Sequence, residues 1–175
     1  MLKDDMKYGS NPELDKLIND DHHYVRLAVG KQGYGLNKLI NDDEPDVRAT
    51  VARQGYGLEK LVNDEDEWVR GAVAGQGYKL DKLVDDESDV VRREVAKQGY
   101  GLDKLVNDED WFVRAEVVRQ GYGLGILIND DVSVVCKPAK EKLIEQDLLY
   151  KLDKANNKVS KQQINFDKEK SMESR

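Results

Sequence analysis

The sequence predicts an all-α solenoid of about five to six short helical repeats, and two observations lead to this prediction. The triplet Gln-Gly-Tyr recurs every 22 residues, beginning at Gln32, Gln54, Gln76, Gln98 and Gln120. Paired leucines and paired valines recur between the triplets, three or four residues apart, which is the spacing of short amphipathic helices. A constant period of this size is typical of arrays in which each repeat packs only on its neighbours.

Five full repeats follow one another before the pattern fails. They begin at Leu14, Leu36, Leu58, Leu80 and Leu102. A sixth repeat begins at Leu124 and breaks down near Lys137, so we place the solenoid at residues 11–137. Residues 1–10 are polar and are expected to form a frayed end. Asn11 followed by Pro12 suits the start of a helix, with asparagine as the cap and proline at the first helical position.

Each repeat is expected to contain two helices, as the third repeat illustrates. A first helix of one or two turns covers residues 58–62, where apolar side chains share one face. A second helix over residues 65–76 carries two valines four residues apart, Val69 and Val73. It should stop at Gly77, because glycine adopts the left-handed conformation that closes a helix. An isolated helix this short is unstable in water, so stacking must supply the stability.

The chain departs from the repeat pattern after the fifth repeat. Cys136 replaces the repeated arginine, and Pro138 falls where a helix interior would lie, so a new helix is expected to start at Pro138. We predict a capping helix over residues 138–154 that covers the last repeat with an apolar stripe at Ile144, Leu148 and Leu152. Residues 155–175 are polar and are predicted to be a disordered tail.

Composition narrows the class of protein. The net charge is −7 with a pI near 5.0, and residues 137–175 carry ten Lys/Arg against seven Asp/Glu, which leaves −10 on residues 1–136. This balance opposes non-specific binding to nucleic acid or to an anionic membrane. A single cysteine excludes an internal disulfide framework. The sequence lacks a signal peptide and a membrane-spanning stretch, so we expect a soluble cytoplasmic protein, and no cofactor is predicted.

An aspartate, a valine and an arginine recur at a constant spacing, as in Asp64, Val69 and Arg70. This pattern resembles HEAT-type repeats, and the short unit with paired leucines looks like the leucine-rich repeat variant family, over residues 11–135. The resemblance implies a short 3₁₀ helix alternating with an α-helix, a right-handed superhelix, and a ladder of charge-assisted hydrogen bonds between the aspartates and arginines of successive repeats. The unit is shorter than in those families, and the single cysteine excludes the iron–sulfur cluster known in one member.

Function is expected where the repeats differ, because identical positions hold the fold. With its valines buried, the second helix should expose the positions two before, two after and six after the first valine, with the position just before that valine at the margin. We predict that Trp68 forms a shallow groove beside Gly71 and Gly75, and that Trp111 points outwards. The alternative is that Trp68 and Phe112 are wedges between helices. The candidate partner-binding residues are Tyr24, Trp68, Gly71, Gly75, Arg93, Lys97, Trp111, Phe112 and Arg119.

Other conspicuous residues are interpreted as structural. The five repeated tyrosines stand beside helix-ending glycines, and the repeated lysines have acidic neighbours that favour a solvated, salt-bridged face. His22 and His23 would point about 100° apart on a helix and would make a poor chelate. The Asn-Asp clusters lack the glycine and terminal glutamate of an EF-hand, and Cys136 has no activating setting, so no metal or catalytic site is predicted.

Two hypotheses of function follow from these patterns. The favoured one is a non-enzymatic solenoid that binds another protein or a peptide along its second helices, with aromatic anchors and charged selectors. The alternative is nucleic-acid binding, by resemblance to the HEAT-like DNA glycosylases, although the acidic body and the lack of an irregular carboxylate oppose it. A purely structural spacer is the third possibility.

Overall fold

The computed structural model describes residues 11–173, and the side chains of residues 11–155. The frayed end predicted for residues 1–10 lies outside the described residues. The chain divides into two compact units, Met1–Tyr122 and Gly123–Arg175. All regular elements of the described chain are helices, as the all-α prediction requires.

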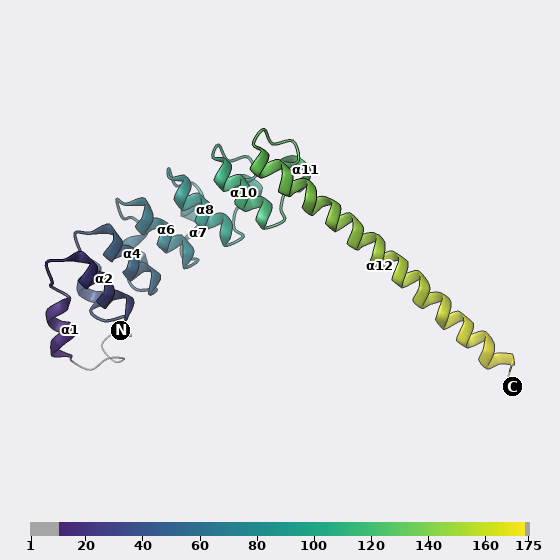
Figure 1. Cartoon of the computed structure of the whole chain (residues 1–175), viewed down its shortest axis with the longest axis horizontal. Helices are drawn as coiled ribbons and strands as arrows, with labels where there is room; N and C mark the ends of the chain where they lie inside the picture. Colours follow the sequence, from purple (N-terminus) through teal and green to yellow (C-terminus); the bar gives the residue numbers. More distant parts are fainter. Residues whose placement is uncertain (1–10, 174–175) are drawn as a thin grey trace. The chain divides into compact units, whose positions relative to one another are not determined.

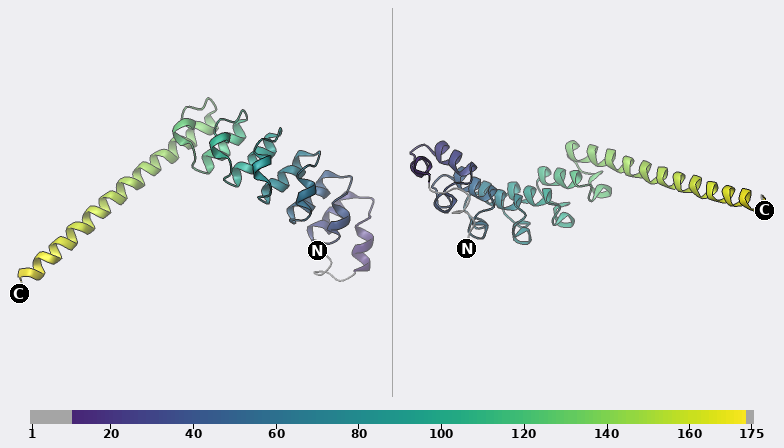
Figure 2. Two further views of the ribbon diagram at one scale, coloured as in Figure 1. Left: turned by 180° about the vertical axis from the view of Figure 1, so that it is seen from behind. Right: turned by 90° about the horizontal axis from the view of Figure 1, so that it is seen from below.

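The first unit contains five pairs of helices, each made of a short helix and a longer one. Successive pairs follow one another in a stack (Figures 1 and 2), which confirms the helical repeat architecture. The short helices predicted at the start of each repeat are present and are α-helical, since their amides bond carbonyls four residues back, as Ile40 bonds Leu36 at 2.9 Å, whereas the family resemblance implied 3₁₀ geometry. In chain order the helices are α1 Pro12–Leu17, α2 His23–Lys31, α3 Leu36–Leu39, α4 Pro45–Arg53, α5 Leu58–Leu61, α6 Glu67–Gly75, α7 Leu80–Leu83, α8 Asp89–Lys97, α9 Leu102–Leu105 and α10 Trp111–Arg119.

Local signals position these helices as the sequence predicts. Asn11 caps α1 by accepting hydrogen bonds from the amides of Glu13 and Leu14.

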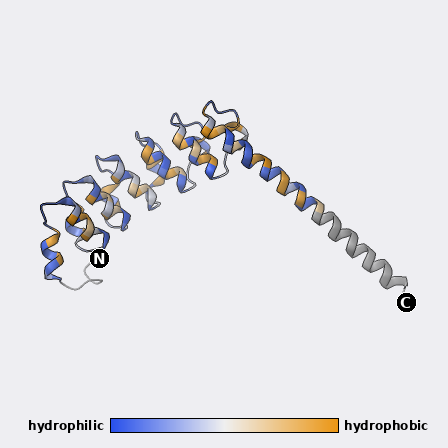
Figure 3. Ribbon diagram, viewed as in Figure 1, coloured by the Kyte–Doolittle hydropathy of each residue, from blue (hydrophilic) through white to orange (hydrophobic). Residues whose placement is uncertain are grey.

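The repeated leucines and valines form one continuous apolar core between the short and the long helices, and apolar stretches recur in every pair in Figure 3. Burial of each such side chain contributes roughly 1.5–3 kcal/mol before the entropy of ordering is subtracted.

The longer helices of successive repeats lie side by side, and their contacts bury one position that was expected to be exposed. The most extensive contacts in the first unit join α4 to α6 and α6 to α8. The position two residues after the first valine, expected on the exposed face, is therefore buried at Ala49, Gly71 and Ala115. The exposed face is centred on the position just before that valine, where Tyr24 and Trp68 are 72% and 54% exposed.

An arginine–aspartate ladder joins successive repeats, as expected from the repeated pattern. Arg70 donates from Nε and Nη2 to the two carboxylate oxygens of Asp86, both at 2.8 Å. Its Nη1 donates to the backbone carbonyls of Asp64 and Glu65 in its own repeat. Asp86 also accepts from the amide of Ser88, two residues further on. The same set of bonds links Arg26 to Asp42, Arg48 to Asp64 and Arg92 to Asp108.

A second ladder explains the repeated glutamine. Gln76 Nε2 donates to the carbonyl of Arg53 at 3.2 Å, which satisfies an acceptor at the end of the preceding helix. Gln54, Gln98 and Gln120 make the same bond to the repeat before them. The repeated lysines bridge neighbouring loops in the same way, as Lys60 does to Asn41 and Lys104 to Asp85. Of the repeated lysines, Lys104 forms a salt bridge in this row, whereas Lys60 and Lys82 bond asparagine side chains, so the predicted salt-bridged face is present only in part.

The second unit contains α11 (Leu124–Leu127) and the long helix α12 (Ser133–Glu173), which pack on each other. The sequence predicts a helix start at Pro138, but α12 begins five residues earlier and continues through Pro138. Proline removes one backbone hydrogen bond, to the carbonyl of Val134, a residue that is 53% exposed. The backbone is helical as far as Glu173, where a disordered tail was expected from residue 155.

The residues that pack α12 against the rest of the second unit also differ from the predicted capping stripe. In the part of α12 whose side chains are described, up to residue 155, the buried residues are Val135 and Ala139, near its start. The predicted capping stripe is exposed instead, with Ile144 at 69% and Leu148 and Leu152 each about half exposed. The stripe therefore lies on another face of α12 than Val135 and Ala139, and up to residue 155 it is the first turns of the helix that join the core of the second unit. None of the helices in the described part of the chain is long and apolar enough to cross a membrane.

Removing one carboxylate of the ladder should destabilise the stack. Asp64→Ala leaves the Arg48 guanidinium, which is only 10% exposed, without its bidentate partner. We expect the free energy of unfolding to fall by about 2–3 kcal/mol, because an unpaired, largely buried charge is costly. The neighbouring Glu65→Ala is the matched control, since that carboxylate is 92% exposed and contacts Arg48 only at 3.8 Å. Equal losses in urea denaturation of the two variants would contradict the structural role of the ladder.

The ladder also predicts acid sensitivity. Burial raises the pKa of Asp64, but the hydrogen bonds from Arg48 and from the amide of Asp66 outweigh burial and hold it below 3.8. The pKa values of Asp42 and Asp86 are lowered by the same balance. A lowered folded-state pKa gives stability that is present above the unfolded value and is lost as pH falls through the folded value. Thermal melts should therefore show Tm constant from about pH 7 to 5 and falling below about pH 4, whereas a Tm independent of pH down to 2 would exclude this linkage.

Lys79 offers a test of backbone strain. Four of the short helices are preceded by glycine with φ between 61° and 66°, whereas Lys79 takes φ 51° before α7. A side chain in this left-handed region costs roughly 1–2 kcal/mol, offset in part by the entropy that glycine loses on folding. Lys79→Gly should raise the free energy of unfolding by about 0.5–1 kcal/mol in urea titration. Gly101→Lys, the reverse change at the equivalent position, should lower it by a larger amount, because its Cβ would also meet Val84 Cγ2 at 2.5 Å. A Lys79→Gly variant no more stable than the parent would argue against strain.

Candidate functional site

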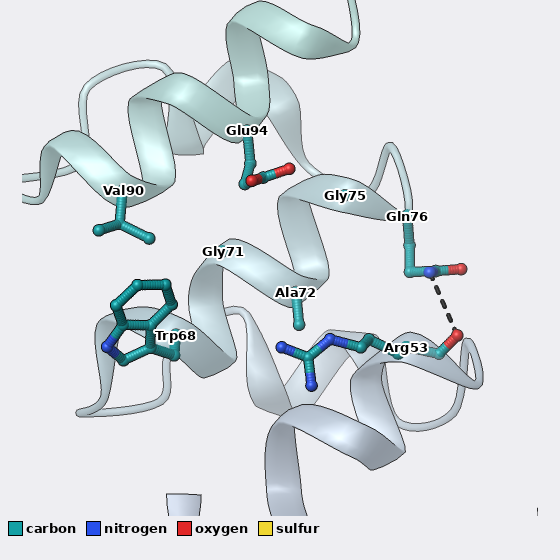
Figure 4. Close-up of a pocket in the computed structure, with 8 residues that line it drawn as sticks. All are labelled: Arg53, Trp68, Gly71, Ala72, Gly75, Gln76, Val90 and Glu94. Atoms are coloured by element: carbon teal, nitrogen blue, oxygen red, sulfur yellow. Dashed lines mark hydrogen bonds between the residues drawn. The ribbon is translucent and has the colours of Figure 1, made fainter. Parts of the chain in front are cut away.

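A pocket of about 210 Å³ opens on the exposed face of α6, between α4 and α8. Trp68, Gly71 and Gly75, three of the predicted site residues, lie together in its lining. Figure 4 shows the tryptophan ring at one end of the pocket and the backbone of α6 as its floor. The predicted groove beside Trp68 is therefore present as geometry. The full lining is Arg53, Trp68, Gly71, Ala72, Gly75, Gln76, Val90 and Glu94.

The pocket exists because α6 lacks two side chains that other repeats possess. In the next repeat, Arg93 and Lys97 stand where Gly71 and Gly75 stand here. A Cβ on Gly71 would meet Val90 Cγ1 at 3.5 Å, and a Cβ on Gly75 would approach only Glu94 Oε2, at 4.0 Å. Both are ordinary contacts, so the packing between α6 and α8 does not require glycine at either position.

The two ends of the pocket differ in chemistry. Trp68 and Val90 form an apolar end, with the indole ring still half exposed. Arg53 and Glu94 form polar walls on opposite sides, from α4 and α8 (Figure 4). Gln76 holds the carbonyl of Arg53 and so ties this wall to the end of α6. The result is a short amphipathic groove with one aromatic wall.

The charges of the polar walls are not equivalent. Glu94 accepts a hydrogen bond from Lys97 Nζ at 2.5 Å, so its charge is already balanced within α8. Among the described residues, by contrast, no carboxylate pairs with the Arg53 guanidinium. The polar part of the pocket therefore presents one unneutralised positive charge.

The structure places the other predicted residues outside this pocket. Tyr24 lies on α2 and contacts His23, with ring centroids 4.1 Å apart. Phe112 is 44% exposed and stacks on Trp111 at 3.6 Å between centroids, while Trp111 is only partly exposed. Phe112 is thus the more exposed of the two, which reverses the expectation that Trp111 points outwards.

The three predicted basic residues do not form one charged cluster that could select a partner: Arg93, Lys97 and Arg119 have different neighbours. Arg93 Cζ lies 6.0 Å from the Phe112 ring centroid, and its Nε is buried without a partner among the described residues. Lys97 is bonded to Glu94, and Arg119 Nη1 donates to Glu116 at 2.7 Å. Of the three, only Arg93 reaches from α8 to α10, where it lies near Phe112.

Five lining residues are not among the predicted site residues: Arg53, Ala72, Gln76, Val90 and Glu94. Arg53 and Val90 belong to variable positions, but they come from the repeats before and after Trp68. Glu94 occupies the position three after the first valine, which holds Ala28, Thr50, Ala72, Glu94 and Glu116 along the chain. This variability was a usable signal, since a position that varies among near-identical repeats is not fixed by the fold.

The lining offers limited chemistry. It supplies one guanidinium, one carboxylate and one side-chain amide, and it contains no hydroxyl, thiol or imidazole. Within the described residues no three His, Cys, Asp or Glu side chains gather where they could hold a metal ion. A second hollow, lined by Ile40, Arg48 and Lys60 among others, belongs to the ladders and contains Asp42 and Asp64, which are already paired. No protein-family model, curated protein or solved structure matches this chain.

Proposed function

We propose that this protein is a non-enzymatic solenoid that binds another protein or a peptide, and that the pocket on α6 receives one large apolar side chain of that partner. The observation that carries the proposal is the pair of glycines in α6. The resemblance to HEAT-like and leucine-rich repeat variant arrays, and a cytoplasmic location, are parts of the same proposal and rest on the sequence.

The glycines are costly where they stand. Glycine inside a helix is less favourable than alanine by about 1 kcal/mol, with a smaller cost for Gly75 because it is the last residue of α6. Steric space does not require them, since alanine fits at both positions. Their combined effect is to leave the space beside Trp68 open, with Gly71 buried at the floor of the pocket and Gly75 exposed. A feature that lowers stability and opens a pocket is expected where binding benefits from it.

The size of the pocket favours a side chain over a free small molecule. Small-molecule sites usually enclose roughly 300–1,000 Å³, whereas this pocket encloses about 210 Å³. A cavity of roughly 150 Å³ holds a benzene ring. One aromatic or branched side chain therefore fits, with the rest of the partner lying over the surface. An exposed tryptophan at the rim is the kind of residue that dominates binding energy at protein interfaces.

Replacing a pocket glycine with the residue found at the same position in another repeat should abolish binding without destabilising the fold. Gly75→Lys restores the residue found at Lys97, and we expect the free energy of unfolding to stay equal or rise by about 0.5 kcal/mol, because lysine is the better helix former. Gly71→Ala should raise it by about 1 kcal/mol. Both variants should lose partner binding while remaining fully folded by circular dichroism.

Binding can be measured by selection from a displayed library of random 12-residue peptides. Wild type should enrich a family of sequences that share a large apolar residue, and Gly75→Lys should not retain them. Ala28→Lys, on the exposed part of α2, is a control that adds the same charge away from the pocket. Enriched peptides that bind wild type and Gly75→Lys equally would place binding elsewhere and contradict the proposal.

A further inference from the structure

We propose that the pocket on α6 selects a peptide in which a carboxylate lies beside the inserted apolar side chain, with Arg53 as the residue that recognises the carboxylate. This inference rests on the proposed function and adds the charge of the partner to it. Two observations carry it: the position of Arg53 at the pocket, and the balance of charge around it.

Arg53 is placed to meet a ligand. It lies at the end of α4, and its side chain extends along the pocket wall beneath Ala72, towards Trp68 (Figure 4). Its backbone carbonyl is held by Gln76, which fixes the point from which the side chain extends. The guanidinium offers several N–H donors in one plane, a geometry that matches the two oxygens of a carboxylate.

The neighbouring cations are already engaged, and Arg53 is not. Lys97 and Arg119 occupy the position of Arg53 in later repeats, and each bonds a glutamate three residues before it. The equivalent position before Arg53 is Thr50, a neutral and buried residue. No carboxylate among the described residues pairs with Arg53, so its partner can be supplied by the ligand.

The acidic body of the protein does not reverse this preference. Residues 1–136 carry −10, which repels an acidic peptide at long range. At 0.15 M salt such interactions are screened beyond about 8 Å, whereas a direct contact with Arg53 acts at hydrogen-bond distance. An exposed ion pair of this kind corresponds to a gain of up to about fivefold in affinity.

The chain offers its own reporter for the test. It has two tryptophans, Trp68 and Trp111, so Trp111→Phe leaves Trp68, at the pocket, as its single tryptophan, which can be excited selectively over the tyrosines. The probes are three terminally blocked pentapeptides with a central phenylalanine flanked by two glutamates, two glutamines or two lysines. Each is titrated at 0.15 M salt into this single-tryptophan protein, into the same protein with Arg53→Gln, and into a Lys31→Gln control.

The glutamate peptide should bind about fivefold more tightly than the glutamine peptide, and the lysine peptide most weakly. Arg53→Gln should abolish the difference while leaving the affinity of the glutamine peptide unchanged, and Lys31→Gln should preserve it. Equal binding of the glutamate and glutamine peptides, or a preference that survives Arg53→Gln, would overturn this inference and leave the pocket as a binding site. If none of the three changes the fluorescence of Trp68, the proposed function of the pocket is overturned as well.

Discussion

The bidentate pair between an arginine and the aspartate of the next repeat is the constraint on which this stack depends. Leucines and valines supply most of the favourable free energy, but burial of apolar surface is not directional and does not fix one repeat against the next. The arginine–aspartate pair does so, because the arginine also binds carbonyls of its own loop and the aspartate also binds an amide of its own turn. Two loops and one helix start are thereby held in a single geometry.

The pocket on α6 is tolerated because those constraints lie at the edge of the stack. Trp68, Gly71 and Gly75 lie on the opposite side of α6 from the buried valines, and no side chain of theirs takes part in either ladder, since Gly75 contributes only its backbone carbonyl, to Gln98. Substitution on this face therefore changes the surface without changing the spacing of the helices. Neighbouring intervals show the same backbone with other surfaces, as where Arg93 and Phe112 meet between α8 and α10.

Most of the fold could be predicted because its signals are local: glycines end the helices, Asn11 caps the first one, and a fixed period marks the repeats. The site was predicted in part, since Trp68, Gly71 and Gly75 belong to one helix and their proximity follows from helical spacing. Arg53 and Glu94 come from adjacent repeats, and only the stacking shows which rows of side chains meet. The burial of Ala49 and the exposed stripe of α12 were missed because a single helix does not reveal what covers its flanks.

The two ladders also fix how this chain can change in length. One joins residues 16 apart and the other joins residues 23 apart, across the same boundary between repeats. Inserting or deleting a single residue inside a repeat would shift both sets of partners at once, whereas adding or removing 22 residues would leave every pair intact. The array can therefore be lengthened only by whole repeats of 22 residues. In a chain that has gained one repeat, sites on either side of the insertion lie one repeat further apart, and the rest of the surface is unaltered. The hydrogen bonds between repeats thus fix the spacing of binding sites along the array.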